Sequence, residues 1–259
     1  MDLGLKGKRA LVTGASAGLG KATAMALADE GAIVTINSRD RDRLELAANE
    51  IDRHAGQKPT LAVGDLSVPG DVNKIIEIAG HVDILVSNTG GPPPGDFLDH
   101  SPEEWDRAGE LLLHSAINLT RAVIESMKEQ HWGRLIYSTS VAVLQPIDNL
   151  ILSNAFRAGL TGFCKTISNT YAKYGITANT VCPGYTATER LQNLAGKIAE
   201  DTGKTSEAVL QGFGDAAPAG RVGKPEELAA LIVFLASDKA AYITGTSIPV
   251  DGGLNKSLI

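Results

Sequence analysis

The chain has 259 residues, which suits one large α/β domain or two small ones and is enough to bury a full hydrophobic core. Hydrophobic residues make up 43% of it and charged residues 21%, as in an ordinary globular protein. The net charge of −6 argues against nucleic acid or an anionic membrane as the main partner. No run approaches the about 18 apolar residues of a membrane helix, so no membrane partner is expected.

The N-terminal stretch 1–6 lacks the charged and then apolar pattern of a signal peptide. Cys164 and Cys182 form no metal-ligand spacing with the five histidines, and reduced thiols inside a cell are favoured. We therefore expect a cytoplasmic protein without a metal site.

The strongest functional motif is the stretch 13–20, Thr-Gly-Ala-Ser-Ala-Gly-Leu-Gly. It follows a predicted buried strand at 9–12 and precedes an alanine-rich helix that ends in glycine. In this context Gly14 permits a tight turn, Gly18 lets backbone N–H groups approach a pyrophosphate, and Gly20 lets helix and strand pack closely. The helix N-terminus then offers unpaired amides and its positive dipole end to the phosphates.

This glycine spacing, G-x-x-x-G-x-G after a threonine, resembles that of the short-chain dehydrogenase/reductase family. The resemblance runs over residues 5–253 and is strongest to the 3-oxoacyl-(acyl carrier protein) reductase-like branch. It implies a single-domain, doubly wound Rossmann fold with seven parallel strands, helices on both faces, and NADP(H) at the carboxyl ends of the strands. It also implies that Ser16 and Leu19 bind the cofactor together with the three glycines.

Residues 32–37 form the predicted second strand, and the residues after it bear on cofactor choice. An acidic residue there would bind the ribose 2′-hydroxyl of NAD, whereas an arginine accommodates the 2′-phosphate of NADP. This chain has Ser38 and Arg39, with no carboxylate before Asp40. Because Arg39 offers a planar guanidinium and Ser38 a hydroxyl, NADP(H) is preferred and NAD(H) is the alternative. Arg39 could instead only begin the charged face of the next helix, at 40–54.

The predicted third strand, at 61–64, is followed by Asp65 and Leu66. The resemblance implies that the Asp65 side chain contacts the adenine amino group and that Leu66 packs against the adenine ring. From the residues alone, Asp65 could equally cap the helix that begins near Pro69.

The predicted strand at 82–87 leads into Asn88 and Gly90, which survive from the family's N-N-A-G signature. By resemblance, Asn88 ties the central strands together, and Gly90 lets the backbone pass close to the cofactor ribose. Gly91 and the prolines at 92–94 then make a stiff loop, which either shapes a wall of the substrate site or only forms a well-made turn.

A long helix is predicted at 102–128, capped by Ser101 with Glu104 as the capping-box acid, and Gly109 interrupts it. By the family's spacing, a catalytic asparagine belongs at position 112. This chain has Leu112 there, which is its first departure from the four catalytic residues of the family.

The predicted strand at 133–140 ends in Ser140, at the place of the family's serine that orients the substrate carbonyl. The family's Tyr-x-x-x-Lys pair should follow on one helical face, where lysine grips the nicotinamide ribose and lowers the tyrosine pKa. This chain has Ser153 and Arg157 at those positions. The predicted catalytic residues are therefore Ser140, Ser153 and Arg157, with Arg157 also binding the cofactor.

A serine hydroxyl is a poor general acid, and an arginine stays charged and cannot carry a proton. Proton transfer would need water or another side chain. Candidates are Tyr185, His114, and a water held between Ser140 and Ser153, while ordinary packing is the alternative for Tyr185 and His114.

The predicted strand at 175–184 ends in Pro183 and Gly184, which by resemblance border the nicotinamide. Thr186 and Thr188 follow at positions where family hydroxyls meet the carboxamide and the phosphates.

Residues 189–214 form a predicted helical lid over the substrate. It is apolar enough for an acyl or hydrophobic substrate, although an empty lid must also bury its own side chains. A further helix and a last strand at 246–253 complete a single domain over residues 1–259.

Two functions remain open. In the first, the chain is an NADP(H)-dependent oxidoreductase that transfers hydride between nicotinamide and a carbonyl or alcohol substrate, as 3-oxoacyl reductases do, through a rebuilt proton relay. In the second, it is a sensor or structural protein that binds a dinucleotide without turnover. Ser140, Arg157 and the lid favour the first. The resemblance also implies a homotetramer or homodimer that pairs the long helices at 102–128 and 149–174.

Overall fold

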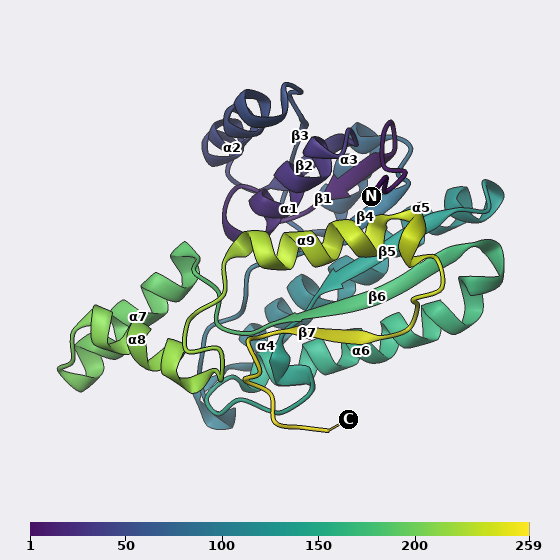
Figure 1. The fold of residues 1–259 in the computed structure, drawn as a ribbon. Helices are drawn as coiled ribbons and strands as arrows, with labels where there is room; N and C mark the ends of the chain where they lie inside the picture. The colour runs from purple at the N-terminus through teal and green to yellow at the C-terminus, as the bar shows by residue number, and fades with distance from the viewer. Residues whose placement is uncertain (259) are drawn as a thin grey trace.

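One parallel sheet of seven strands forms the centre of the computed structural model, which describes residues 1–258 (Figure 1). The strands follow the order β3-β2-β1-β4-β5-β6-β7, and every neighbouring pair is parallel. Their bounds are β1 Arg9–Val12, β2 Ile33–Ser38, β3 Thr60–Val63, β4 Ile84–Ser87, β5 Gly133–Ser138, β6 Ile176–Pro183 and β7 Ser247–Val250. The predicted doubly wound Rossmann fold is confirmed.

Residues 1–258 also form nine α-helices and several shorter helical turns. The α-helices are α1 Gly18–Asp29, α2 Arg41–Ala55, α3 Pro69–Ala79, α4 Pro102–Gly109, α5 Ser115–Glu129, α6 Ile151–Tyr171, α7 Glu189–Thr202, α8 Ser206–Ala216 and α9 Pro225–Ala236. The shorter turns are η1 Phe97–Asp99, η2 Glu110–His114, η3 Val141–Val143, η4 Ala172–Tyr174 and η5 Asp238–Ala240.

The helices cover both faces of the sheet in two apolar layers. Successive strand residues point to opposite faces, so Ile84 and Val86 of β4 join one layer and Leu85 joins the other. The first layer contains the buried sides of α1, α2 and α9, and the second those of α3, α5 and α6. Burial on both faces explains why the strands are continuous apolar runs rather than alternating ones.

The helix predicted at 102–128 is divided into α4, the π-helical turn η2 and α5. The Ser101 and Glu104 capping box is present, and the wider turn begins directly after Gly109. A side chain at Gly109 would approach the Phe156 ring to 3.0 Å, so this glycine lets the helix pass close to α6. π-turns inside helices are frequent at functional sites, and this one carries Leu112.

Helices α7 and α8 project together from one end of the molecule (Figure 1). They occupy the segment predicted as a lid, and their apolar side chains pack against one another around Ala195, Ala199 and Val209. No helix within residues 1–258 is long and apolar enough to cross a membrane.

Strands β1 and β4 are joined at their carboxyl ends by Thr13 and Asn88. The buried Thr13 hydroxyl donates to the Asn88 carbonyl at 2.8 Å and accepts from the Asn88 N–H at 2.9 Å. The Asn88 side chain donates back to the carbonyls of Thr13 and Gly14. Asn88 therefore ties the central strands together, as the family resemblance implied.

We expect Thr13→Val to lower the free energy of unfolding by about 1–3 kcal/mol, because it leaves a half-buried N–H and carbonyl of Asn88 without this hydroxyl. Thr170→Val is the matched control, since Thr170 is exposed and its hydroxyl bonds only the Thr166 carbonyl one turn earlier. Urea denaturation measures both variants. Equal losses would mean that the Thr13 hydroxyl has no special role.

Candidate functional site

The loop between β1 and α1 forms a cradle of backbone that leaves no room for side chains. Gly14 and Gly18 have φ of 58° and 53°, in the left-handed region. A Cβ at Gly14 would lie 2.7 Å from the Asn88 carbonyl oxygen, and one at Gly20 would overlap the Gly14 carbonyl. The tight turn at Gly14 and the close packing of helix and strand at Gly20 agree with what the glycine spacing predicts.

The N-terminus of α1 has no side-chain cap, and its first turn carries no acidic residue. Helices α2, α4, α7 and α8 each begin at a residue whose side chain accepts a backbone N–H. The first amides of α1 are thus available to an external acceptor, with the positive end of the helix dipole behind them. Together with the cradle, this arrangement fits the pyrophosphate of a dinucleotide.

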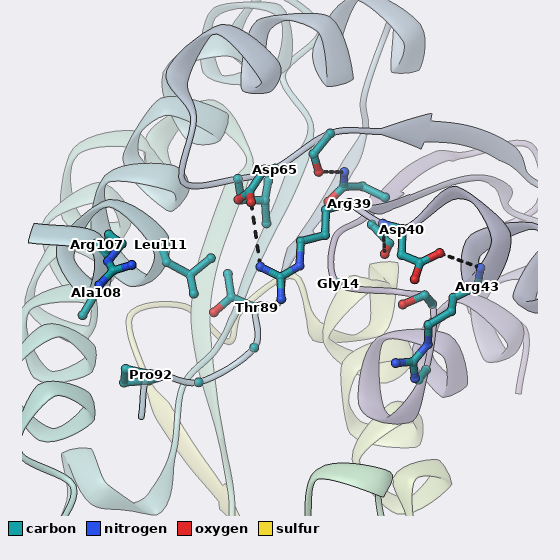
Figure 2. A pocket seen from close by; sticks show the side chains of 18 of the residues that line it. Gly14, Arg39, Asp40, Arg43, Asp65, Thr89, Pro92, Arg107, Ala108 and Leu111 are labelled. Atoms are coloured by element: carbon teal, nitrogen blue, oxygen red, sulfur yellow. Dashed lines mark hydrogen bonds and ion pairs between the residues drawn. The ribbon is translucent and has the colours of Figure 1, made fainter. Parts of the chain in front are cut away.

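A first pocket of about 700 Å³ lies at the carboxyl ends of β1, β2 and β3 (Figure 2). Arg39 extends into it with 81% of its side chain exposed, and its guanidinium lies 3.8 Å from an Asp65 carboxylate oxygen. The other Asp65 oxygen accepts from the Ser67 N–H and hydroxyl. Helix α3 begins after Val68 without a side-chain cap, so Asp65 is not the helix cap that the sequence alone allowed.

A second pocket of about 550 Å³ adjoins the first through the loop at 89–93. Ser140, Ser153 and Arg157 all line it, although Ser140 comes from the turn after β5 and the other two from α6. Strand β5 ends at Ser138, two residues before the predicted end at Ser140. The Ser140 hydroxyl accepts from the Ala142 N–H at 3.1 Å, and this bond fixes its position at the start of η3.

Arg157 is buried at the base of the second pocket, with only 7% of its surface exposed. Its guanidinium donates to the carbonyls of Ser138 at 2.9 Å and Gly90 at 3.4 Å. No carboxylate pairs with it anywhere in residues 1–258. Burial, and then the positive charge of Arg190, lower the pKa of Arg157 to about 10, so it remains charged at neutral pH.

The two side chains predicted as alternative proton donors occupy different places. Tyr185 lines the second pocket and stacks on Phe213 with ring centroids 4.4 Å apart. Burial raises the pKa of Tyr185, which makes it a weaker acid. His114 lies outside the residues that line the two pockets and bonds Glu110 at 2.9 Å. Leu112 is buried and supplies no polar group.

The predicted site residues divide between the two pockets. The first pocket is lined by Gly14, Ser16, Ser38, Arg39, Asp65, Leu66 and Gly90. The second is lined by Leu19, Asn88, Ser140, Ser153, Arg157, Pro183, Gly184, Thr186 and Thr188. Gly18 and Gly20 line neither pocket and act by shaping the loop, where Gly18 lies against the Thr188 methyl group.

Four basic residues of the pockets were not predicted. Arg43 of α2 and Arg107 of α4 line the first pocket, while Arg190 and Lys197 of α7 line the second. The available signal was weak: Arg190 follows Thr188 by two residues, and an exposed arginine in a lid helix is common. Its contact with Gly91 is visible only in three dimensions.

The sheet, its glycine-rich loop and the adjoining pockets define a protein of the Rossmann class. A family model described as enoyl-(acyl carrier protein) reductase matches residues 14–255. A 3-oxoacyl-(acyl carrier protein) reductase of Aquifex aeolicus is 32% identical over 258 residues, which is 98% of this chain and 100% of that protein. One from Synechocystis is 36% identical over 252 residues, or 95% and 96% of the two chains.

Solved structures are similar over the whole length. The L-sorbose reductase of Gluconobacter frateurii, complexed with NADPH and L-sorbose, has a TM-score of 0.95 at 33% identity and covers 100% of both chains. The chain belongs to the short-chain dehydrogenase/reductase family of oxidoreductases, in the branch that resembles 3-oxoacyl-(acyl carrier protein) reductases.

We expect Gly20→Ala to weaken dinucleotide binding by about tenfold or more, because the methyl group displaces the Gly14 backbone and misplaces amides that would bond phosphate. Gly162→Ala is the control: it is also helical, with nothing within 4 Å of an added Cβ. Fluorescence titration with NADPH measures both variants, and circular dichroism checks folding. Unchanged affinity in a folded Gly20→Ala would contradict a phosphate role for this loop.

Proposed function

We propose that this protein is an NADP(H)-dependent oxidoreductase that interconverts a carbonyl and an alcohol. The observation that supports it best is the joining of two pockets: the glycine cradle and Arg39 lie on one side, and Ser140, Ser153 and Arg157 lie on the other. A bound nicotinamide would supply or accept the hydride. The family of oxidoreductases to which the chain belongs supports the same reaction class.

The preference for NADP(H) over the alternative NAD(H) is supported by the end of β2. Ser38 and Arg39 stand there, and Arg39 is mostly exposed and held only by Asp65 at 3.8 Å. A guanidinium so placed is free to turn to a 2′-phosphate, which it binds with charge-assisted hydrogen bonds. The similar L-sorbose reductase was solved with NADPH, in agreement with this choice.

In the proposed reaction, the Ser140 hydroxyl orients the substrate carbonyl and Arg157 holds the ribose side of the cofactor. Arg157 cannot move a proton, because it stays charged, and a serine hydroxyl is a poor acid. The raised pKa of Tyr185 makes that side chain a poor donor as well. We infer that a water held between Ser140 and Ser153 relays a proton from bulk solvent to the carbonyl oxygen. It gives up one proton as the hydride arrives and takes one from solvent, so it stays neutral.

A second candidate function is dinucleotide binding without turnover, as a sensor or structural protein. Arg157 supports it, because its guanidinium is already engaged by the Ser138 and Gly90 carbonyls. A side chain held in this way stabilises the site without doing proton chemistry.

The remaining predictions concern the whole protein. We propose a single domain for residues 1–259, of which Ile259 lies outside the described residues, and a lid at 189–214. Leu191 and Leu194 of this lid line the second pocket, as an acyl or otherwise apolar part of a small-molecule substrate would require. The homotetramer or homodimer and the cytoplasmic location remain predictions.

We expect Arg39→Asp to weaken NADPH binding by about tenfold or more and to leave NADH binding nearly unchanged, because only NADPH carries the 2′-phosphate. Arg41→Asp is the matched control: it makes the same charge change on an exposed residue of α2 that lies outside the first pocket. Equilibrium titrations with both cofactors give the ratio of the NADPH to the NADH dissociation constant for each variant. Equal losses for NADPH and NADH would overturn the 2′-phosphate assignment.

The reaction itself is tested by NADPH oxidation with a panel of 3-oxoacyl thioesters, quinones and small ketones. We expect the wild-type protein to turn over a member of the panel and Ser153→Tyr/Arg157→Lys to gain no further activity, because the native relay does not use a tyrosine. Cofactor binding is checked for both proteins. A silent wild type that binds NADPH, beside an active double variant, would favour the second candidate.

A further inference from the structure

The second pocket carries positive charge without any acidic residue. Arg157, Arg190 and Lys197 line it, and none of its lining residues, all within the described part of the chain, is Asp or Glu. This excess is notable in a protein of net charge −6. The first pocket, by contrast, is lined by both signs of charge: Arg39, Arg43 and Arg107 together with Asp40, Asp65 and Glu104.

The Arg190 guanidinium lies against the backbone of the loop at Gly91. A methyl group at Gly91 would overlap the Arg190 guanidinium, so the second glycine of this loop makes room for the charged group. Lys197 follows two helical turns later on α7 and lines the same pocket. Arg190 forms no ion pair within residues 1–258, and its charge lowers the pKa of Arg157.

The acidic side chains closest in sequence to this pocket are engaged elsewhere. Glu189, the neighbour of Arg190, pairs with Arg43 of α2. Asp251, which lies against Gly184, accepts the N–H groups of Gly253 and Asn255. Three like charges therefore line one cavity, and an anion placed there would relieve their repulsion.

We propose that the second pocket binds an anionic substrate, one that carries a carboxylate or a phosphate group, with Arg190 as the main partner of that group. Arg157 and Lys197 add positive charge, and the planar guanidinium of Arg190 can bond either anion at two oxygens. The inference rests on the proposed function for the position of the reacting carbonyl, beside Ser140 and Ser153.

The cofactor phosphates are the competing explanation for this charge. The uncapped start of α1 and the glycine cradle already offer the pyrophosphate its donors, and Arg39 offers a donor to the 2′-phosphate. Arg190 and Lys197 lie on the lid helix, on the side of the second pocket. Substrate and cofactor roles of Arg190 therefore predict different losses when its charge is removed.

The test is calorimetric titration, with and without saturating NADP⁺, using two matched pairs: acetoacetate with methyl acetoacetate, and dihydroxyacetone phosphate with dihydroxyacetone. We expect at least one anion to bind about tenfold or more tightly than its neutral partner, and Arg190→Gln to remove that difference while keeping NADPH affinity. Arg53→Gln removes the same charge from an exposed residue of α2 and should change neither the preference for the anion nor the NADPH affinity. Gly91→Ala, which displaces the guanidinium without removing charge, should reduce the preference for the anion.

Equal affinity of the charged and neutral members of both pairs, or no binding of either anion at millimolar concentration, would overturn the inference. An equal loss of NADPH and anion affinity in Arg190→Gln would do the same, because Arg190 would then serve the cofactor. NADPH oxidation is recorded separately for each compound. Selective anion binding without oxidation would support the inference and contradict the proposed reduction, so the two can fail independently.

Discussion

The hydrogen bonds between Thr13 and Asn88 hold the sheet together where its strand order reverses. Strand β1 leads to α1 on one face, and β4 leads through α4 to α5 on the other, so the chain leaves these neighbouring strands in opposite directions. Such a divergence opens a crevice at the carboxyl ends of the strands. Gly14 lies against Asn88 with no room for a Cβ. The contact that joins β1 to β4 therefore also shapes the glycine-rich loop between β1 and α1.

By the family resemblance, Ser153 and Arg157 stand in the second pocket at the positions of a tyrosine and a lysine. A tyrosine beside a lysine would give an acidic hydroxyl, whereas Ser153 beside Arg157 gives a neutral hydroxyl and a fixed charge. The fixed charge is buried and bonded only to neutral carbonyls, which satisfy its N–H groups but not its charge. The second pocket therefore presents a buried, fixed positive charge beside two neutral serine hydroxyls.

Local patterns in the sequence predicted individual strands and helices, whereas the seven-stranded doubly wound fold was predicted from the family resemblance. Strand β1, the glycine loop and α1 were predicted from an apolar run, turn residues and an alanine-rich segment. These signals are local, because each lies within a short window of sequence. The π-helical turn at Leu112 was not predicted, because it depends on the packing of α4 against α6. Arg190 was missed for the same reason: its contact with Gly91 joins residues far apart in the sequence.

The start of α7 connects the two pockets. Thr188 caps this helix and lies against Gly18 of the phosphate loop. Glu189 pairs with Arg43 beside the first pocket, and Arg190 faces the second. Consecutive residues of a helix point about 100° apart, so neighbouring side chains can serve the two pockets from one backbone position. A shift of α7 would therefore change the charges around both pockets together.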